Sequence, residues 1–388
     1  MASTTSLPPW PLPEGITEDY IDCTTTCGLN FHVLKAGQPG QPLILFCHGY
    51  PELSFSWRKV MPSIAAQGYY CVAMDQRGYG RTTGWAQRPF HDVQLEEYTM
   101  TNLIRDLICL VYRLGYKDVA CIIGHDFGGM ASAMAPLMRP EIFKSSIQMS
   151  HPFHRPPQPL LGDEHPKRSL DIQAELAKLD PPRKHYKWYN STPEAHAHWE
   201  NPEQGLEAYL RGYFHLKSAD WEHNKPHPIK EWSAEQLAIM PEYYILRREE
   251  TFPQAIARNM HSTSADPKKT ESWLPPSDLA VYVSEWKRTG FQGALNWYRA
   301  QTASTPQSRK DLYLFAGRRI EVPVMFVSGK QDWGNYQQPG ALEGYRSDEV
   351  VGEGCLRGVV LVEGAGHWVQ QEQPGRVVEE VVGFLRSL

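Results

Sequence analysis

The chain has 388 residues, 41% of them hydrophobic and 12 of them tryptophan, enough to build the core of one large domain or two. The formal net charge of −5 and the lack of a basic run argue against a nucleic-acid partner. No N-terminal apolar signal region and no apolar run long enough to span a membrane are present, so we expect a cytoplasmic protein.

The cysteines and histidines do not form a metal-binding pattern. Cys47, Cys71 and Cys121 lie in apolar runs, where a free thiol behaves as a small buried hydrophobe. Cys23 and Cys27 have no second Cys or His pair at a zinc-finger spacing. We therefore predict neither a zinc site nor a disulfide. The sequence also contains no Gly-rich phosphate loop of the kind that would indicate a nucleotide cofactor.

Predicted strands alternate with predicted helices over the first 150 residues. Alternating polarity over 20–35 indicates two antiparallel strands that meet near Gly28. Further strands are predicted over 42–47, 69–74, 119–123 and 145–149, and helices over 57–67 and 98–115. This alternation predicts an α/β fold with a mostly parallel, doubly wound sheet.

The composition changes over residues 154–310, which are rich in Trp, Tyr, His and Pro and contain no convincing buried strand. Helical stretches there cover 203–215, 232–248 and 277–289. Strand patterns return at 322–328 and 357–362, before a closing helix over 377–388.

We therefore predict a core formed by 1–150 and 315–388, with a mainly helical cap over 151–314 inserted between its two parts. Ligands of such sheets bind outside the C-terminal ends of the strands. A cap inserted there would bury the site and exclude water.

Residues 118–134, DVACIIGHDFGGMASAM, have the layout of a nucleophile elbow: an apolar strand, a Gly-flanked turn and a helix of small residues. The turn presents Asp126 above the C-terminal edge of the sheet. A carboxylate with an ordinary pKa of about 3.9 is ionised at neutral pH and can attack a saturated carbon. The resulting alkyl ester must then be cleaved by water. The alternative is an Asp that only caps the helix.

Two later loops supply a base for that water and an acid to orient the base. Asp332 follows the strand over 322–328, and His367 follows the strand over 357–362. The order nucleophile, acid, histidine, with each group just beyond a strand end, is typical of a catalytic triad on this kind of sheet.

Backbone N–H groups are needed to stabilise the oxyanion of ester hydrolysis. The candidates are the amides of Phe127, after Asp126, and of Tyr50 in the turn His48-Gly49-Tyr50-Pro51. The other histidines are interpreted as structural, with His125 packed under the elbow. Four further histidines belong to no motif that would pair them with another functional group: His151, His154, His185 and His215.

These motifs resemble those of the α/β-hydrolase superfamily, and specifically of the soluble epoxide hydrolases. They are HGYP at 48–51, DQRGYG at 75–80, GHDFGG at 124–129, SGKQD at 328–332 and GAGHW at 364–368. The resemblance spans nearly the whole chain after about residue 15. It implies the α/β-hydrolase fold, an epoxide as small-molecule substrate, a reaction that needs no cofactor or metal, and a cis peptide before Pro51.

Epoxide hydrolases use two cap tyrosines to bind and protonate the epoxide oxygen. Residues 290–299, GFQGALNWYR, resemble the segment that carries one of them, which implies Tyr298. Residues 185–189, HYKWY, resemble the other segment, where Tyr186 matches better than Tyr189. An alkoxide is far more basic than a phenolate, so a phenol with an ordinary pKa of about 10 can protonate it.

Two alternatives remain. The same motifs occur in haloalkane and haloacetate dehalogenases, which expel a stable anion and need no acid. Phe127 stands where the family often has Trp, and so lacks an N–H that haloalkane dehalogenases use to hold halide. The second alternative is a non-catalytic ligand receptor.

Of these functions, we expect hydrolysis of an epoxide to a vicinal diol. Turnover should fall as the pH drops below the ordinary imidazole pKa of about 6.5, because His367 must be neutral.

Overall fold

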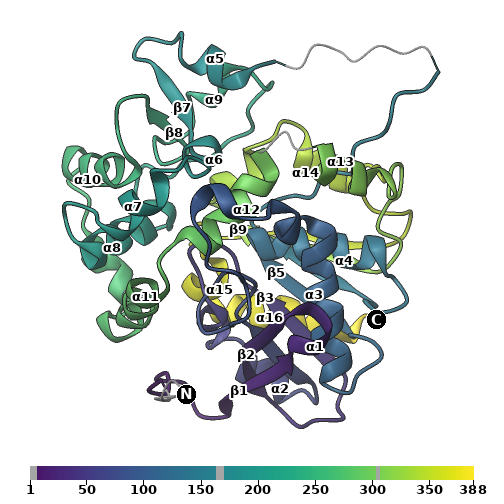
Figure 1. The fold of residues 1–388 in the computed structure, drawn as a ribbon. Coiled ribbons are helices and arrows are strands. Elements are labelled where there is room, and N and C mark those ends of the chain that lie inside the picture. Colours follow the sequence, from purple (N-terminus) through teal and green to yellow (C-terminus); the bar gives the residue numbers. More distant parts are fainter. Residues whose placement is uncertain (1–6, 163–169, 303–305) are drawn as a thin grey trace.

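The computed structural model describes residues 7–162, 170–302 and 306–388. Its centre is an eight-stranded sheet in the order β1-β2-β4-β3-β5-β6-β9-β10 (Figure 1). The strands are β1 (Ile16–Cys23), β2 (Leu29–Ala36), β3 (Leu43–Cys47), β4 (Tyr70–Met74), β5 (Cys121–His125), β6 (Ser146–Met149), β9 (Val324–Gly329) and β10 (Leu356–Val362). The β1–β2 and β2–β4 pairs are antiparallel and all others are parallel, which confirms the predicted α/β class.

Alternate residues of the buried strands face two separate hydrophobic clusters. Ile123 belongs to the cluster that contains residues of α2 and α16, whereas Ile122 belongs to the cluster that contains residues of α3 and α4. Because successive side chains of a strand point to opposite faces, helices cover both sides of the sheet. These helices are α2 (Met61–Ala65), α3 (Met100–Arg113), α4 (Phe127–Met138), α14 (Ala341–Arg346), α15 (Val369–Glu372) and α16 (Pro374–Arg386).

The first two strands form the predicted hairpin. Ile16 pairs with Ala36 at its open end, and the four-residue helix α1 (Thr24–Cys27) connects the strands. Gly28 ends that helix at φ +81°, a left-handed conformation that glycine adopts without a steric penalty.

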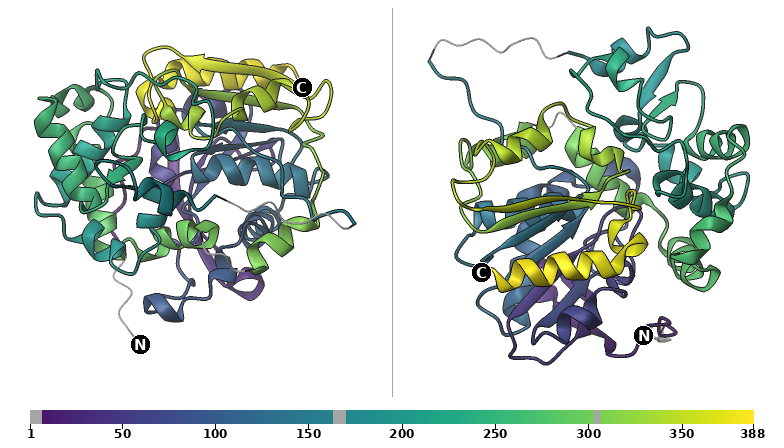
Figure 2. Two further views of the ribbon diagram at one scale, coloured as in Figure 1. Left: turned by 90° about the horizontal axis from the view of Figure 1, so that it is seen from above. Right: turned by 180° about the vertical axis from the view of Figure 1, so that it is seen from behind.

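The chain between β6 and β9 adds no strand to the central sheet within the described residues. Its helices are α5 (Ile172–Leu176), α6 (Tyr186–Tyr189), α7 (Ala195–Glu200), α8 (Leu206–Lys217), α9 (Ala234–Leu237), α10 (Phe252–Ser262), α11 (Pro276–Thr289), α12 (Gln292–Thr302) and α13 (Pro306–Tyr313). Figures 1 and 2 show α5 to α11 as a body beside the sheet, with α12 returning against it. The division into a core and a cap at residues 150 and 315 stays a prediction.

Two helix predictions are wrong because of proline. The helix expected over 232–248 is only α9, and Pro241 precedes a short strand, β8 (Ile245–Arg247), that pairs with β7 (Arg183–His185). The expectation of no buried strand in this region is therefore also wrong. The helix expected over 57–67 reduces to α2, because a proline, Pro62, is tolerated only in the first turn of a helix.

Short 3-10 helices occupy several connections. They are η1 (Ser54–Trp57), η2 (Phe90–Asp92), η3 (Leu95–Tyr98), η4 (Pro267–Ser272) and η5 (Trp333–Tyr336). In the described part of the chain, no helix combines the length and apolarity needed to cross a bilayer.

Candidate active site

Asp126 lies on the turn between β5 and α4, in the strained backbone conformation expected of a nucleophile elbow. Its φ of 53° and ψ of −114° lie outside the regions that residues with a side chain favour. A Cβ on Gly124 would lie 1.8 Å from the carbonyl oxygen of Gly128, and one on Gly128 would lie 2.0 Å from that of Cys47. The close strand–helix approach therefore requires both glycines.

The structure brings Asp126, His367 and Asp332 together at the C-terminal edge of the sheet. His367 Nδ1 lies 3.1 and 3.2 Å from the two carboxylate oxygens of Asp332. His367 Nε2 faces Asp126 Oδ2 at 3.8 Å and has no hydrogen-bond partner among the described residues. All three side chains are buried. This is the geometry that the triad prediction requires.

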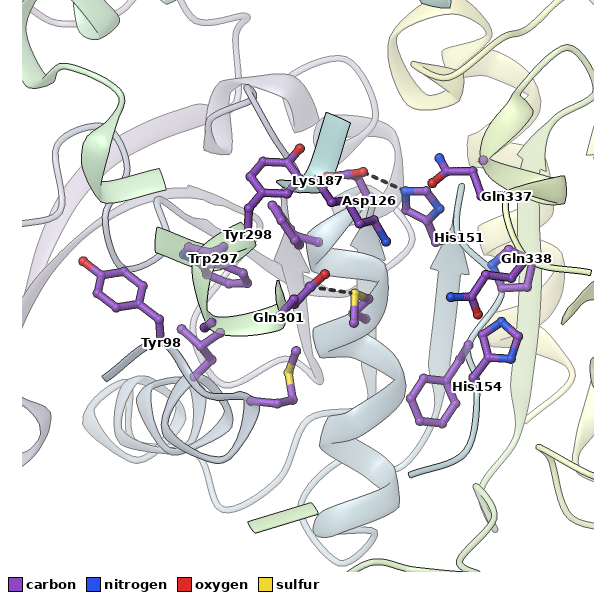
Figure 3. A pocket seen from close by; sticks show the side chains of 18 of the residues that line it. Tyr98, Asp126, His151, His154, Lys187, Trp297, Tyr298, Gln301, Gln337 and Gln338 are labelled. Atoms are coloured by element: carbon purple, nitrogen blue, oxygen red, sulfur yellow. Dashed lines mark hydrogen bonds and ion pairs between the residues drawn. The ribbon is translucent and has the colours of Figure 1, made fainter. Parts of the chain in front are cut away.

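The two oxygens of Asp126 have different partners. The Tyr50 amide donates a hydrogen bond to Oδ1 at 3.0 Å, and the Tyr50–Pro51 peptide is cis, as the resemblance implies. His151 Nε2 lies 3.0 Å from Oδ2 (Figure 3). Burial opposes ionisation, but His151 and His367 hold the pKa of Asp126 well below its usual value, so the carboxylate is charged.

The interpretation of His151 as a histidine without a partner is therefore wrong. Its position carried a signal: Ser150 and His151 come directly after β6, just as Asp332 and His367 follow β9 and β10. Ser150 was also missed. Its Oγ donates a hydrogen bond to Asp332 Oδ2 at 2.6 Å and lies 3.0 Å from His367 Nδ1.

His125 packs under the elbow, as predicted. Its Nε2 lies 2.6 Å from the carbonyl oxygen of His367, and its Nδ1 lies 2.6 Å from Glu52 Oε2. Burial favours the neutral ring, but the Glu52 carboxylate raises the pKa of His125. The pair thus supports the segment that carries His367.

Lys217, at the end of α8, is a buried cation near the triad. Its Nζ donates to the Tyr213 hydroxyl at 3.2 Å and lies 4.7 Å from the ring centroid of Tyr244. Its backbone carbonyl accepts a hydrogen bond from the His367 amide at 2.8 Å. Burial first, and then the charge of Lys217, lowers the pKa of His367 to about 4. The imidazole is therefore neutral at neutral pH.

A cavity of about 320 Å³ opens beside Asp126. Tyr186 and Tyr298 line it, with ring centroids 5.8 Å apart, and burial raises the pKa of both phenols well above the usual value. Tyr186 donates a hydrogen bond to Gln337 Oε1 at 3.2 Å. Tyr189 is not among the described lining residues, and its hydroxyl lies 2.8 Å from His198 Nδ1. The geometry thus favours Tyr186 over Tyr189.

Comparison with known proteins identifies the family of the chain. A family model described as alpha/beta hydrolase fold matches residues 42–205. Epoxide hydrolase A of Mycobacterium tuberculosis is 30% identical over 377 residues, which cover 96% of this chain and 98% of that protein. An epoxide hydrolase of Caballeronia sordidicola is 29% identical over 367 residues, which cover 94% and 92% of the two chains.

Solved structures give the same result. An epoxide hydrolase from an endophytic Streptomyces has a TM-score of 0.74 and 26% identity, with 96% of each chain covered. Potato (Solanum tuberosum) epoxide hydrolase I has a TM-score of 0.69 and 27% identity, with 96% of this chain and 100% of that chain covered. The chain therefore belongs to the epoxide hydrolase family and has the α/β-hydrolase fold.

Proposed function

We propose that the protein converts epoxides to vicinal diols in two steps, through an alkyl ester on Asp126. The observation that supports this proposal is that one cavity is lined by an ionised carboxylate and by two phenols that burial keeps protonated. A nucleophile and an acid in the wall of one small cavity suit the opening of a strained cyclic ether.

In the first step, Asp126 Oδ2 attacks an epoxide carbon and the C–O bond to that carbon breaks. Oδ1 remains on the Tyr50 amide, so Oδ2 is the oxygen free to form the ester bond once substrate displaces its contact with His151. Tyr186 and Tyr298 hydrogen-bond the epoxide oxygen, and one of them transfers its proton to the alkoxide.

In the second step, His367 takes a proton from a water molecule, which attacks the ester carbonyl carbon. Asp332 stabilises the imidazolium through its contacts with Nδ1. The negative charge develops on Oδ1, where the amides of Tyr50 and Phe127 can stabilise it. The Phe127 amide is free to do so because it belongs to the first turn of α4. The bond between the carbonyl carbon and the ester oxygen then breaks, and the imidazolium protonates the leaving alkoxide, which releases the diol. The water oxygen remains in the Asp126 carboxyl group, whose proton returns to the phenolate left by the first step.

A dehalogenase of the same fold is the alternative. Among the described residues that line the cavity, Trp297 is the one tryptophan. Its indole N–H donates a hydrogen bond to the carbonyl oxygen of Arg77 at 2.9 Å. Phe127 has no side-chain N–H. Neither aromatic ring therefore offers the donor that would hold a departing halide, which disfavours this alternative.

A turnover screen tests the proposed function. We expect diol formation from styrene-oxide-like, stilbene-oxide-like or fatty-acid epoxides and no halide release from haloacetate. Halide release without diol formation would support the dehalogenase. Binding of an epoxide without turnover by the intact triad would support a ligand receptor.

Turnover limited by ester hydrolysis is expected to persist well below pH 6.5 and to fall as the pH approaches about 4, the lowered pKa of His367. The neutral imidazole is the active form, so activity is present above this pKa and is lost below it. Lys217→Met removes a positive charge and should move the acid limb of the pH profile upward by on the order of one unit.

Lys184→Met is the control, since Lys184 lies 4.9 Å from the ring centroid of Tyr189, away from the described cavity lining. Its pH profile should match that of the unchanged protein. An acid limb that stays in place in Lys217→Met would show that Lys217 does not set the pKa of the base.

A further inference from the structure

The backbone of the loop 364–368, which carries His367, is bound by groups outside the loop. The amides of Gly366 and Trp368 donate hydrogen bonds to the two carboxyl oxygens of Glu372, each at 2.9 Å. The His367 amide between them donates to the carbonyl oxygen of Lys217 at 2.8 Å. Since the backbone carries the imidazole, these three bonds help to fix the place of the base.

Glu372 also binds the chain that is inserted between β6 and β9. Its Oε2 accepts a second hydrogen bond, from the amide of Ala219, at 2.8 Å. Ala219 lies just after the end of α8, far from Glu372 in the sequence. One carboxyl group thus has three backbone donors, two from the loop that carries His367 and one from the segment after α8.

The two segments that Glu372 joins meet backbone against backbone. A Cβ on Gly366 would lie 2.5 Å from the carbonyl oxygen of Lys217 and 2.7 Å from the amide nitrogen of Ala219. Only glycine permits so close an approach. Because no flexible side chain separates the segments, a shift of residues 217–219 would be passed directly to the loop that carries His367.

We propose that Glu372 is a positioning residue for the second step, because it joins the loop that carries His367 to the segment after α8 and so keeps the imidazole in place to activate water. This inference rests on the proposed function. Without the carboxyl group, the amides of Gly366, Trp368 and Ala219 would lose their acceptor. An unsatisfied amide is unfavourable where water has little access, so the loop would shift toward other partners.

The competing role for Glu372 is a purely structural one, in which it only stabilises α15 and the fold around it. Its loss would then lower both steps of the proposed reaction together, or lower the amount of folded protein. A residue that positions the base affects the two steps differently, because ester formation does not use His367 and ester hydrolysis does. The rates of the two steps therefore separate the two roles.

Single-turnover measurements with an epoxide substrate give both rates. In Glu372→Met, which keeps a long side chain but removes the acceptor, we expect ester formation at nearly the original rate. Ester hydrolysis should be slower by on the order of a hundredfold, which a small misplacement of a catalytic group can cost. The ester on Asp126 should then accumulate during turnover and be detected as added mass. Glu372→Gln keeps one carbonyl oxygen as an acceptor and should restore part of the hydrolysis rate.

Glu363→Met is the matched control. Glu363 lies in the same connection between β10 and α15, but its side chain is exposed and pairs with Lys330 at the surface. An exposed ion pair contributes little to stability, so both rates should equal those of the unchanged protein.

Hydrogen exchange without substrate tests the contact itself. The amides of 364–368 and 217–219 should exchange faster in Glu372→Met and at the original rate in Glu363→Met. Equal losses in both steps, an unchanged rate of ester hydrolysis, or unchanged exchange in Glu372→Met would overturn the inference and leave the proposed function standing. If the unchanged protein forms neither ester nor diol, the proposed function is refuted. Faster exchange in Glu372→Met would then still support the role of Glu372 in holding the loop, and unchanged exchange would overturn it.

Discussion

His367→Gln, mixed with an epoxide substrate, is expected to gain the mass of one substrate molecule, attached to Asp126. The change removes the proposed base of the second step but leaves the Tyr50 contact with Asp126 and the two tyrosines of the cavity, Tyr186 and Tyr298, in place. Loss of one residue from a group of catalytic residues that act together can lower turnover by several orders of magnitude. The ester should therefore persist during the measurement. Intact mass spectrometry would detect the adduct, and peptide mapping would locate it.

Asp126→Ala is the control for this experiment and should show neither adduct nor turnover. Direct attack of water on the epoxide, without a covalent step, predicts no adduct in either variant. That result would refute the role of the elbow carboxylate as a nucleophile, even if the protein hydrolyses epoxides.

General acid catalysis contributes roughly a hundredfold to ten-thousandfold to a reaction rate. The double change Tyr186→Phe and Tyr298→Phe is therefore expected to lower the rate of ester formation by at least this factor. Without a phenol, the epoxide oxygen would leave as an unprotonated alkoxide in a cavity with many apolar side chains in its wall, such as Met100, Leu103 and Phe153. The rate is best followed as adduct formation in the His367→Gln background, which isolates the first step. Each single change should have a smaller effect.

Tyr189→Phe provides a matched control on the same helix as Tyr186. Its hydroxyl contacts His198 and not the cavity, so ester formation should proceed at the original rate. Circular dichroism would establish that the double variant keeps its fold. Full activity in both single variants would contradict the assignment of the acid and strengthen the dehalogenase alternative.

The sequence by itself determined the sheet and the elbow because both depend on local patterns. Apolar runs bounded by turn residues identified the strands of the core, and the glycines around Asp126 identified a turn that only small residues permit. The positions of Asp332 and His367 followed from the rule that parallel strands end at one edge of a sheet. Tyr298 required more than a pattern, since its prediction came from resemblance to a family.

Only the tertiary structure decided which other residues meet at Asp126. His151 follows β6 and Lys217 ends α8, and their contacts with Asp126 and His367 join segments that no periodicity relates. The choice of Tyr186 over Tyr189 was likewise set by which hydroxyl already had a partner in the fold. A side chain's partner and its pKa depend on burial and on charges from distant segments, so the sequence supplied the candidate groups and the packing of the chain selected among them.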